Sequence, residues 1–283
     1  MKVFCIGNGE SRKGFDLNKL KPFGKLYGCN ALYREFTPDV LISVDHGIMH
    51  EIYHSGYGVN NSCIFRDWTK IPDLHYQTLV YEGMSEDDIN RIKKWDMIKQ
   101  NDKPKDSCEF VMHGAKLEGV AKIVNGYNND EMIIKEKYVN QTQLYVSWLH
   151  TKDKVTCITD VLGFDYGYSA GTTSLYISAV IDKPKEIYLI GHDLNTTTGN
   201  LNNVYKDTKH YMASYNKQTD FDKWINQLKT IFTNNPDIQF YKVNNSLNPL
   251  HNDDKVNIIW EEFKGIKNLH YITYEALDKH LQL

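Results

Sequence analysis

The chain has 283 residues, of which 41% are hydrophobic and 12% aromatic, and a chain of this size buries enough apolar surface to fold without disulfide or metal support. Its 18 Gly, 7 Pro and 24% charged residues exclude the collagen-like, low-complexity and disordered classes. The formal net charge of −3 provides no overall field toward nucleic acid or an anionic membrane, so any contact with a polyanion is expected to be local.

The cysteines and the N-terminal segment indicate the compartment. Five cysteines are widely spaced, without a C-x-x-C pair: Cys5, Cys29, Cys63, Cys108 and Cys157. This pattern argues against a disulfide framework or a zinc ribbon and predicts reduced, mostly buried thiols. The apolar run at 3–6 is too short for a signal peptide, and no stretch approaches the ~18 apolar residues of a membrane span. We therefore expect a cytoplasmic protein without a membrane span.

Short apolar runs separated by helix-length polar segments predict an α/β fold with a doubly wound, Rossmann-like parallel sheet. The expected strands lie at 3–6, 25–29, 40–44, 63–65, 186–190 and 238–243. The expected helices lie at 85–100, 172–181 and 219–232. Ser85 and Asp88 form an N-cap pattern at the first helix, and the third helix carries apolar residues at helical spacing. The apolar faces of these helices are expected to pack on the sheet.

Two segments depart from this alternation of strands and helices. Between about 102 and 160 the sequence changes to short runs bounded by Asn, Gly and Asp, which predict a mixed, β-rich insertion within a single domain of residues 1–283. The stretch 192–215 is rich in Asn, Thr, Tyr and Lys and follows a predicted central strand. It is long for a plain connection, so we expect an active-site lid there.

Small and polar residues follow three of the predicted strands. After the first strand, segment 7–11 reads Gly-Asn-Gly-Glu-Ser and puts small residues where a backbone can approach a phosphate or a ribose. A tight turn that needs the φ freedom of glycine is the alternative. Asn30 follows the second strand and Asp45 the third. The carboxyl ends of parallel strands meet at one edge of a sheet, so these groups are expected to converge on a ligand.

A second small-residue turn comes before the second predicted helix and contains Ser169, Gly171 and Thr172. An ordinary N-cap is the alternative interpretation of this turn. The strand that follows the helix ends in His192 and Asp193. An imidazole beside a carboxylate is suited to proton transfer or to metal binding, whereas a strand-end aspartate also serves to cap loops.

One segment matches the H-E-x-x-H pattern of zinc hydrolases, with His50 and His54 as ligands and Glu51 as the base that activates water. His46 lies one helical turn earlier. No third ligand is evident downstream, and the match falls in a βα unit of a nucleotide-type sheet. We therefore favour a solvated helix face here and predict no metal site.

The strand-end motifs together resemble a known family. Segments 6–11 and 27–30, and Gly191-His192-Asp193 followed by Tyr205 and His210-Tyr211, resemble bacterial CMP-sialic acid-dependent sialyltransferases of the lipooligosaccharide type. Segments 38–45 and 189–199 also resemble the 6-hydroxymethylpterin pyrophosphokinase-like and motility-associated flagellin glycosyltransferase group. The similar stretches span residues 1–55 and 168–247. The resemblance implies a GT-A-like variant of the Rossmann-like sheet.

The resemblance also implies roles for individual residues. Residues expected along the nucleotide or donor sugar are Gly7, Asn8, Gly9, Ser11, Asn30, Asp45, Ser169, Gly171, Thr172, Gly191 and Tyr211. Tyr205 is expected to help the nucleotide leave. In those sialyltransferases a histidine general base follows shortly after a His-Tyr pair, whereas Ser214 occupies that place here. The expected base is therefore His210 or His192, with Asp193 as a further candidate.

From these observations we expect a glycosyltransferase that moves a sugar from a nucleotide-activated, CMP-linked donor to a hydroxyl acceptor, with no cofactor besides that donor. One alternative is an ATP-dependent pyrophosphokinase of the 6-hydroxymethylpterin type, with Mg²⁺ on Asp45 and Asp193. A zinc hydrolase that uses His50, Glu51 and His54 is another, and a non-catalytic nucleotide-binding protein is a third. The acceptor (glycan, protein, lipid head group or modified base) and a homo-oligomeric assembly are left open.

Overall fold

The chain folds into two compact units. Unit 1 comprises Met1–Val44 and Tyr166–Leu283, and unit 2 comprises Asp45–Asp165. The computed structural model describes residues 1–72, 98–100, 107–114, 119–128, 131–139, 144–150, 152–167, 169–194, 201–217, 221–246 and 259–282. The insertion expected at about 102–160 falls within unit 2.

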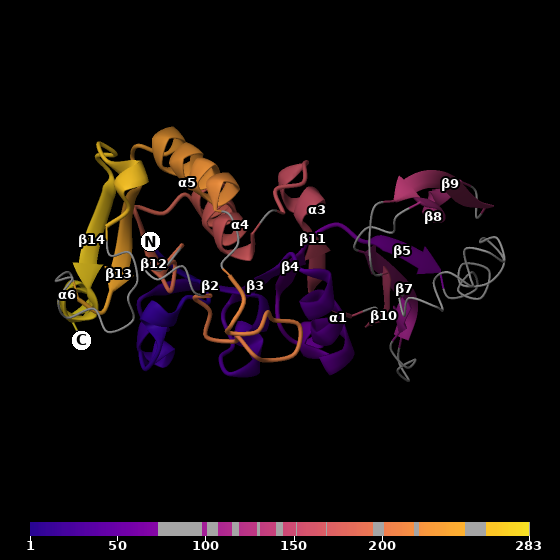
Figure 1. Ribbon diagram of the computed structural model, residues 1–283, viewed down its shortest axis with the longest axis horizontal. Coiled ribbons are helices and arrows are strands. Elements are labelled where there is room, and N and C mark those ends of the chain that lie inside the picture. The colour runs from indigo at the N-terminus through magenta and orange to yellow at the C-terminus, as the bar shows by residue number, and fades with distance from the viewer. Residues whose placement is uncertain are drawn as a thin grey trace. The chain divides into compact units, whose positions relative to one another are not determined.

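A mostly parallel sheet of eight strands organises the fold (Figure 1), in the order β11-β4-β3-β2-β1-β12-β13-β14. Unit 1 contributes β1 (Lys2–Ile6), β2 (Gly24–Cys29), β3 (Val40–Ser43), β12 (Glu186–Ile190), β13 (Gln239–Asn244) and β14 (Leu269–Thr273). Unit 2 contributes β4 (Cys63–Phe65) and β11 (Val155–Cys157), which pair in parallel. The predicted α/β, Rossmann-like class and all six predicted strands are confirmed, and β11 and β14 are additional.

The order of the strands in unit 1 reverses between β1 and β12. From β1 the chain proceeds outward through β2 and β3 on one side, and then returns to pair β12 with the other side of β1. The last registered pair joins Ile6 to Ile190. The loops that leave these two strands therefore begin next to each other, at the topological switch point where doubly wound sheets bind ligands.

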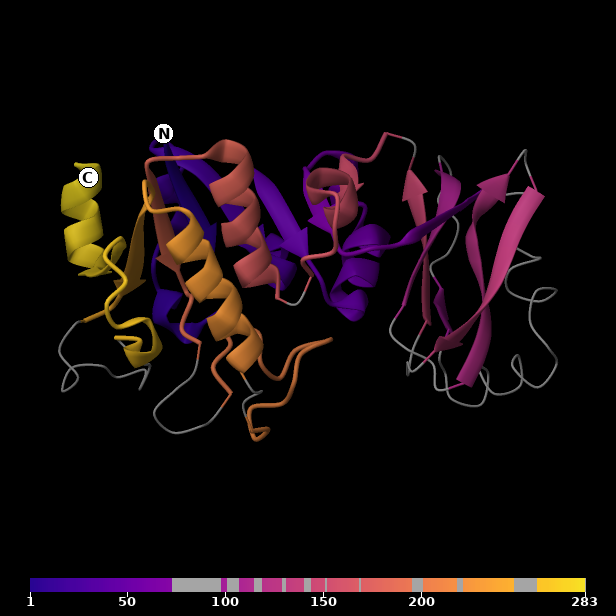
Figure 2. The same cartoon turned by 90° about the horizontal axis from the view of Figure 1, so that it is seen from above.

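Helices cover the sheet of unit 1. α4 (Ala170–Ile177) and α5 (Asp222–Asn234) lie side by side over one face (Figures 1 and 2), and α6 (Tyr274–Leu281) follows β14. α5 buries Leu228, Ile231 and Phe232. The central strands β1 and β12 are buried along nearly their whole length, because a parallel sheet is covered on both faces.

The helices predicted at 172–181 and 219–232 are thus present, with small shifts at their ends. α4 ends at Ile177 and continues as a π-helical turn, Ser178–Asp182. α5 begins at Asp222, and residues 219–220 lie outside the described part of the chain. The short 3₁₀ turns are Glu10–Arg12 (η1), Leu17–Leu20 (η2), Asn30–Arg34 (η3), Tyr57–Val59 (η4) and Glu261–Phe263 (η9).

Unit 2 is rich in β-structure, as the sequence predicts for 102–160. Its helices are α1 (His46–Ser55) and α3 (Ile158–Leu162). A four-stranded sheet has the order β5-β7-β10-β6, with β5 (Thr69–Pro72), β6 (Ile98–Gln100), β7 (Ser107–Gly114) and β10 (Leu144–His150). β8 (Gly119–Asn128) and β9 (Glu131–Val139) form a separate antiparallel pair.

The helix predicted at 85–100 is wrong at its C-terminal end. Residues 98–100 form β6, which pairs with β10 in parallel, so that Ile98 lies opposite Leu144. Pairing with a strand distant in the sequence outweighs the local helical pattern at these residues. Residues 85–97 lie outside the described residues.

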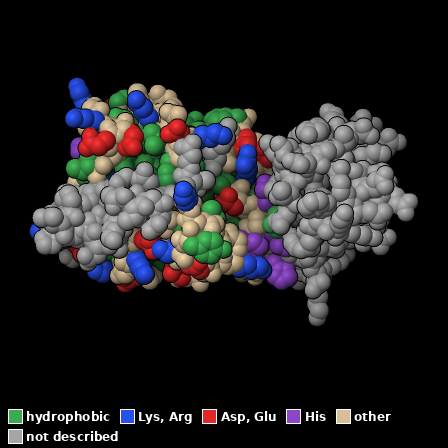
Figure 3. All heavy atoms as spheres, in the orientation of Figure 1, with side chains coloured by type: hydrophobic (Ala, Val, Ile, Leu, Met, Phe, Trp, Pro, Cys, Tyr) green, Lys and Arg blue, Asp and Glu red, His purple; other side chains and the backbone are tan. Residues whose placement is uncertain are grey.

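The described cysteine side chains match the prediction of reduced, mostly buried thiols. Four cysteines are free and buried, namely Cys5, Cys29, Cys63 and Cys157, and the side chain of Cys108 lies outside the described part. Among the described helices, none combines the length and apolar character that a membrane crossing requires. On the face seen in Figure 3, side chains of both charge signs are interspersed over the described residues.

Candidate functional site at the switch point

Two glycines let the loops after β1 and β12 pack directly against each other. The Gly7 amide donates to the Ile190 carbonyl over 2.7 Å, and the Gly9 amide donates to the Gly191 carbonyl over 2.8 Å. A Cβ atom at Gly7 would lie 2.5 Å from the Gly191 oxygen, and one at Gly9 would overlap the carboxylate of Asp193. Gly9 has φ −68, so close approach of the neighbouring loop, rather than a left-handed backbone, requires glycine there.

Asp193 fastens the same two loops through its carboxylate. It accepts hydrogen bonds from the Ser11 amide over 2.9 Å, from the Ser11 hydroxyl, and from the Asn202 side-chain amide over 3.1 Å. Its side chain is buried. Both carboxylate oxygens and the Ser11 hydroxyl are therefore used within the protein, as expected of a strand-end aspartate that caps a loop.

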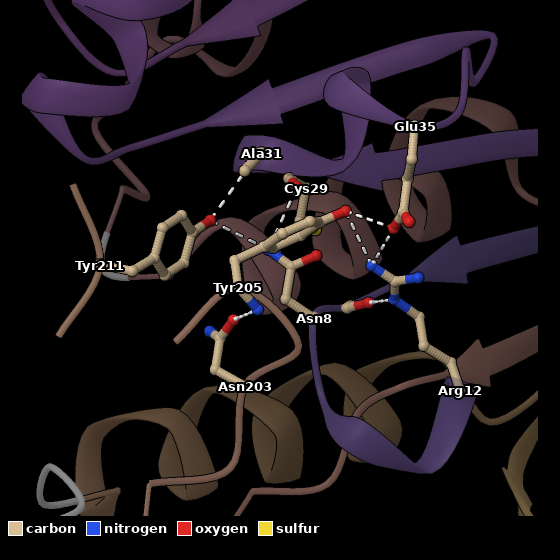
Figure 4. Close-up of polar contacts among 9 residues, drawn as sticks. Asn8, Arg12, Cys29, Ala31, Glu35, Asn203, Tyr205 and Tyr211 are labelled. Carbon is tan, nitrogen blue, oxygen red and sulfur yellow. Dashed lines mark hydrogen bonds and ion pairs between the residues drawn. The ribbon is translucent and has the colours of Figure 1, made fainter. Parts of the chain in front are cut away.

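Asn8 lies between the ends of β1 and β2 (Figure 4). Its amide nitrogen donates to the Cys29 carbonyl and to the Tyr211 hydroxyl, each over 3.3 Å. The same hydroxyl accepts from the Ala31 amide over 3.3 Å. The side-chain oxygen Oδ1 of Asn8 is buried and has no hydrogen-bond partner. The structure thus brings Asn8 and Tyr211 together and leaves one acceptor unsatisfied.

Tyr205 is held by two residues that the sequence analysis missed, Arg12 and Glu35. Arg12 Nη2 donates to Glu35 Oε1 and to the Tyr205 hydroxyl, each over 2.9 Å, and that hydroxyl donates to Glu35 over 2.6 Å (Figure 4). Burial alone would raise the pKa of Glu35, but the hydrogen bonds from Tyr205 and Arg12 outweigh it and lower the pKa. The sequence signal that could have identified Arg12 is its position directly after the Gly-Asn-Gly-Glu-Ser turn.

The hydrogen bonds of Tyr205 bear on its expected role. Burial raises the pKa of this phenol, and the charge of Arg12 only partly opposes the effect. The neutral hydroxyl is therefore committed to Glu35 and Arg12. Tyr205 would have to leave both partners in order to contact a departing phosphate.

Asn30 connects the end of β2 to the end of β3. Its backbone is left-handed, with φ 49, a conformation that asparagine tolerates better than most residues. Its side-chain oxygen accepts from the Ser43 hydroxyl over 3.0 Å and from the Val44 amide over 3.4 Å. Asn30 thus has a structural role at the site edge in addition to the ligand contact that the resemblance implies.

His192 lies at the end of β12 against the first turn of α4. A Cβ atom at Gly171 would lie 3.3 Å from the imidazole Cε1. The ring hydrogen-bonds to the backbone of Cys5, while its Nε2 atom is buried without a partner. Desolvation of the ring and the positive charge of Lys242 lower the pKa of His192 to about 4. The imidazole is therefore neutral at pH 7.

Lys242 is a further residue that the sequence analysis missed. It sits in β13 with no exposed surface, and its ammonium group contacts Asn244 Oδ1 and lies 5.0 Å from the centre of the Trp260 ring. Burial lowers its pKa to about 8, and the carboxylate of Asp193 acts in the opposite direction. A lysine inside an apolar strand run, Phe-Tyr-Lys-Val, was the signal in the sequence.

The turn before α4 acts in part as an ordinary N-cap. Ser169 Oγ accepts from the Thr172 amide over 3.5 Å, the bond expected of an N-cap serine. The Thr172 hydroxyl donates to Gln227 of α5 over 2.6 Å. Gly171 faces His192. Of these three predicted site residues, Gly171 therefore lies beside His192, and the hydrogen bonds of the other two hold the helix in place.

Of the lid predicted at 192–215, residues 192–194 and 201–215 are described, and turns and bends make up most of 201–215. Arg34 connects this segment to η3, by donating to the Thr208 hydroxyl over 2.9 Å and to the Lys209 carbonyl over 3.0 Å. The expected base His210 is exposed and has φ 64. The Ser214 amide donates to Asp207 over 2.7 Å. The structure thus distinguishes the two candidate bases, because His192 has a buried nitrogen at the sheet edge and His210 is exposed.

The H-E-x-x-H segment and Asp45 belong to unit 2. The segment lies on α1 as the pattern requires, but His50 Nδ1 is 2.7 Å from the Ser147 hydroxyl, and His54 is exposed. Within the described residues, no three or more His, Cys, Asp or Glu side chains are grouped to hold a metal ion. Asp45 is the exposed N-cap residue of α1.

The polar groups of unit 1 therefore converge on the adjoining ends of β1, β2, β12 and β13. They present two buried acceptor atoms without donors, Asn8 Oδ1 and His192 Nε2. Comparison of the chain with models of protein families, with curated proteins and with solved structures found no match.

Proposed function

We propose that unit 1 binds a nucleotide-activated sugar of the cytidine type at the switch point and transfers the sugar to a hydroxyl acceptor. The observation that carries the proposal is the pair of buried acceptor atoms, Asn8 Oδ1 and His192 Nε2, which have no hydrogen-bond partner. A buried acceptor without a donor costs about 1–3 kcal/mol. Such a pair favours a ligand that brings donors, and ribose hydroxyls, sugar hydroxyls and the cytosine amino group are donors of this kind.

The state of His192 suits it to accept a proton from the acceptor. Its bond to the backbone of Cys5 leaves a neutral ring with the proton on Nδ1 and Nε2 as an acceptor. In the proposed step the acceptor oxygen bonds to the anomeric carbon and its proton passes to Nε2. The bond between that carbon and the phosphate oxygen breaks, and its electron pair leaves with the nucleotide. The negative charge of the bound donor raises the pKa of the imidazole toward the neutral pH range, so that the ring can hold the proton it accepts.

The departing phosphate needs positive partners. The first turn of α4, which contains Gly171, supplies the positive end of a helix dipole. The Tyr211 hydroxyl lies at the end of β1 in hydrogen-bond contact with Asn8. These groups are suited to a GT-A-like transferase in which segment 201–217 closes over the donor, and in this scheme the protein's own donors stabilise the leaving charge.

The first experiment is a thermal-shift screen against CMP, CDP, UDP, ADP and ATP, each with and without Mg²⁺. Cytidine nucleotides should stabilise the protein with or without the cation, by about 2.7 kcal/mol at a concentration 100 times Kd. Stabilisation by adenine nucleotides alone, and only with Mg²⁺, would instead favour the pyrophosphokinase. A variant Asn8→Ala should lose the response to CMP while its own melting temperature changes little.

The second experiment assigns the base with two matched variants. His192→Ala should lower kcat for sugar transfer or donor hydrolysis by ~10²-fold or more, the usual contribution of a general base. His210→Ala should have a smaller effect, because that side chain is exposed. The assays are run in excess EDTA. Full activity of His192→Ala with loss in His210→Ala would move the base to the lid segment.

A further inference from the structure

Arg12 joins four segments of unit 1 that lie far apart in the sequence. Its Nε atom donates to the Gly7 carbonyl over 2.9 Å, and its Nη2 atom donates to Glu35 Oε1 and to the Tyr205 hydroxyl, each over 2.9 Å (Figure 4). Its aliphatic part packs against the loop after β12, because a Cβ atom at Gly191 would lie 3.0 Å from Arg12 Cδ. Only 6% of the residue is exposed. These bonds are strong, because the donor is charged and water is excluded.

The residues around Tyr205 form a root, 202–206, that is bonded to the loop after β1. The Val204 amide donates to the Asn8 carbonyl over 2.8 Å. Further contacts with the same loop come from Asn202 and Lys206, both to Glu10. No residue of the root is exposed. Backbone bonds and the charged bonds of Arg12 therefore fix the root on the end of β1.

The residues that follow form a tip, 207–214, that Asp207 closes on itself. The Asp207 amide donates to the Met212 carbonyl over 3.1 Å, and Asp207 Oδ1 accepts from the Ser214 amide over 2.7 Å. Most residues of the tip are exposed, in contrast to the root. The tip is thus a compact turn that can move as one piece.

A second arginine, Arg34, connects the tip to the rest of unit 1. It donates to the Thr208 hydroxyl over 2.9 Å and to the Lys209 carbonyl over 3.0 Å. Arg34 is exposed, and bonds of exposed charged side chains contribute little in water. The Tyr211 hydroxyl adds a long bond of 3.3 Å from the Ala31 amide. The tip is therefore held more weakly than the root.

We propose that Arg12 is a positioning residue, which anchors the root on the ends of β1 and β2, so that only the tip moves when a ligand enters and is covered. Tyr205 then stays with Arg12 and Glu35, while His210 and Tyr211 move together with the tip. The closing of the tip over a nucleotide sugar rests on the proposed function. The anchoring does not, because all of its contacts lie within the protein.

Amide hydrogen exchange in the full chain, followed by NMR, tests root and tip separately. The Val204 amide reports on the root, and the Ala31 amide, bonded to Tyr211, reports on the tip. In Tyr205→Phe, which keeps the ring and removes the hydroxyl, Val204 should exchange ~10- to 100-fold faster, as expected for the loss of charge-assisted hydrogen bonds. Arg12→Lys should have the same effect, because an ammonium group cannot reproduce the planar fork of the guanidinium.

The matched control is Arg34→Met, which removes an arginine from the tip instead of the root. It should speed the exchange of Ala31 and leave Val204 at the wild-type rate. A second control is the Phe240 amide of β13, which donates to the Asn268 carbonyl over 2.8 Å. It reports on the stability of unit 1 and should keep its rate in all three variants.

Two results of these measurements would overturn the proposal. One is an unchanged rate of Val204 in Tyr205→Phe, which decides the question even if Arg12→Lys does not fold. The other is equal acceleration of Phe240 and Val204, since a purely structural role would lower the stability of unit 1 as a whole.

A titration of the wild-type protein with CMP separates the anchoring role from the proposed function. CMP should slow the exchange of Ala31, because the tip closes, and should leave Val204 unchanged. Faster exchange of Val204 on binding, or an unchanged rate of Ala31 while CMP binds, would overturn the proposal. If CMP does not bind but the variants release the root as expected, the proposed nucleotide fails and the anchoring role of Arg12 stands.

Discussion

The carboxyl edge of the sheet in unit 1 and helix α1 of unit 2 both carry histidines that the sequence analysis selected, and their surroundings differ. In unit 1, His192 has a buried Nε2 atom without a partner. In unit 2, His50 has its Nδ1 atom next to Ser147, and its ring lies 5.2 Å from that of Tyr145. The histidine of the literal metalloprotease pattern is thus the one whose imidazole contacts other side chains of its own unit, Ser147 and Tyr145. A motif lists residue types, whereas the partners of each atom decide whether it can meet a ligand.

Lowering the pH should have the largest effect on the free energy of unfolding, through one histidine in each unit. Burial and a nearby cation lower the pKa of His192 and of His46 to about 4, below the value of ~6.5 in an unfolded chain. Between these values the unfolded chain binds more protons, so the free energy of unfolding falls as the pH drops from about 6.5 to 4. Each histidine should contribute on the order of 3 kcal/mol, measured by urea titration at each pH.

Two variants separate these contributions. His192→Asn should flatten the acid dependence through unit 1, and His46→Asn should do so through unit 2. If neither variant changes the slope, the carboxylates and not the buried imidazoles control acid stability.

Substitution of glycine by alanine should have the next largest effect on the free energy of unfolding, and the effect should differ between the two units. Gly7→Ala should lower the free energy of unfolding by about 3 kcal/mol, because the new Cβ atom would lie 2.5 Å from the backbone oxygen of Gly191. Gly163→Ala, at the end of α3 in unit 2, meets no atom within 4 Å and bears only the cost of φ +80, about 1 kcal/mol. Urea denaturation measures both, and equal losses would contradict the close packing of the two loops.

Asn30 should show a mixed effect on stability and binding. Asn30→Ala removes the bonds to Ser43 and Val44 and places alanine in a left-handed backbone, so we expect a loss of about 1–2 kcal/mol in stability. CMP affinity should fall by a further ~1–3 kcal/mol. Asn30→Gly removes the same bonds without the backbone cost, and the difference between the two variants isolates that cost. Unchanged calorimetric affinity for CMP in both would remove Asn30 from the nucleotide site.

The smallest effect is expected for Glu51→Gln on α1. The proposed chemistry does not use this residue, so donor turnover should stay at the wild-type level and stability should change by less than about 0.5 kcal/mol. Elemental analysis of the purified protein provides the opposing result. Stoichiometric zinc that chelation removes together with activity would establish the hydrolase instead.

The parallel sheet was predictable from the sequence because its strands are covered on both faces. Such strands appear as continuous apolar runs, and Val3–Ile6 and Ile187–Ile190 are buried throughout. The residues after each run were predictable site candidates because parallel strands bring their carboxyl ends to one edge of the sheet. The prediction of a helix at 85–100 was wrong at its C-terminal end because residues 98–100 pair with β10, far along the chain.

By itself, then, the sequence determined the α/β class, six of the eight strands of the parallel sheet and the edge where polar groups gather, because local hydrophobic patterns encode burial. Only the tertiary structure decided how those groups are used. It joined Ser11 to Asp193 and Arg12 to Tyr205 across more than half of the chain, and it enclosed Lys242 beside Trp260. The physical reason is that hydrogen-bond partners and desolvation depend on residues distant in sequence, which no local pattern specifies.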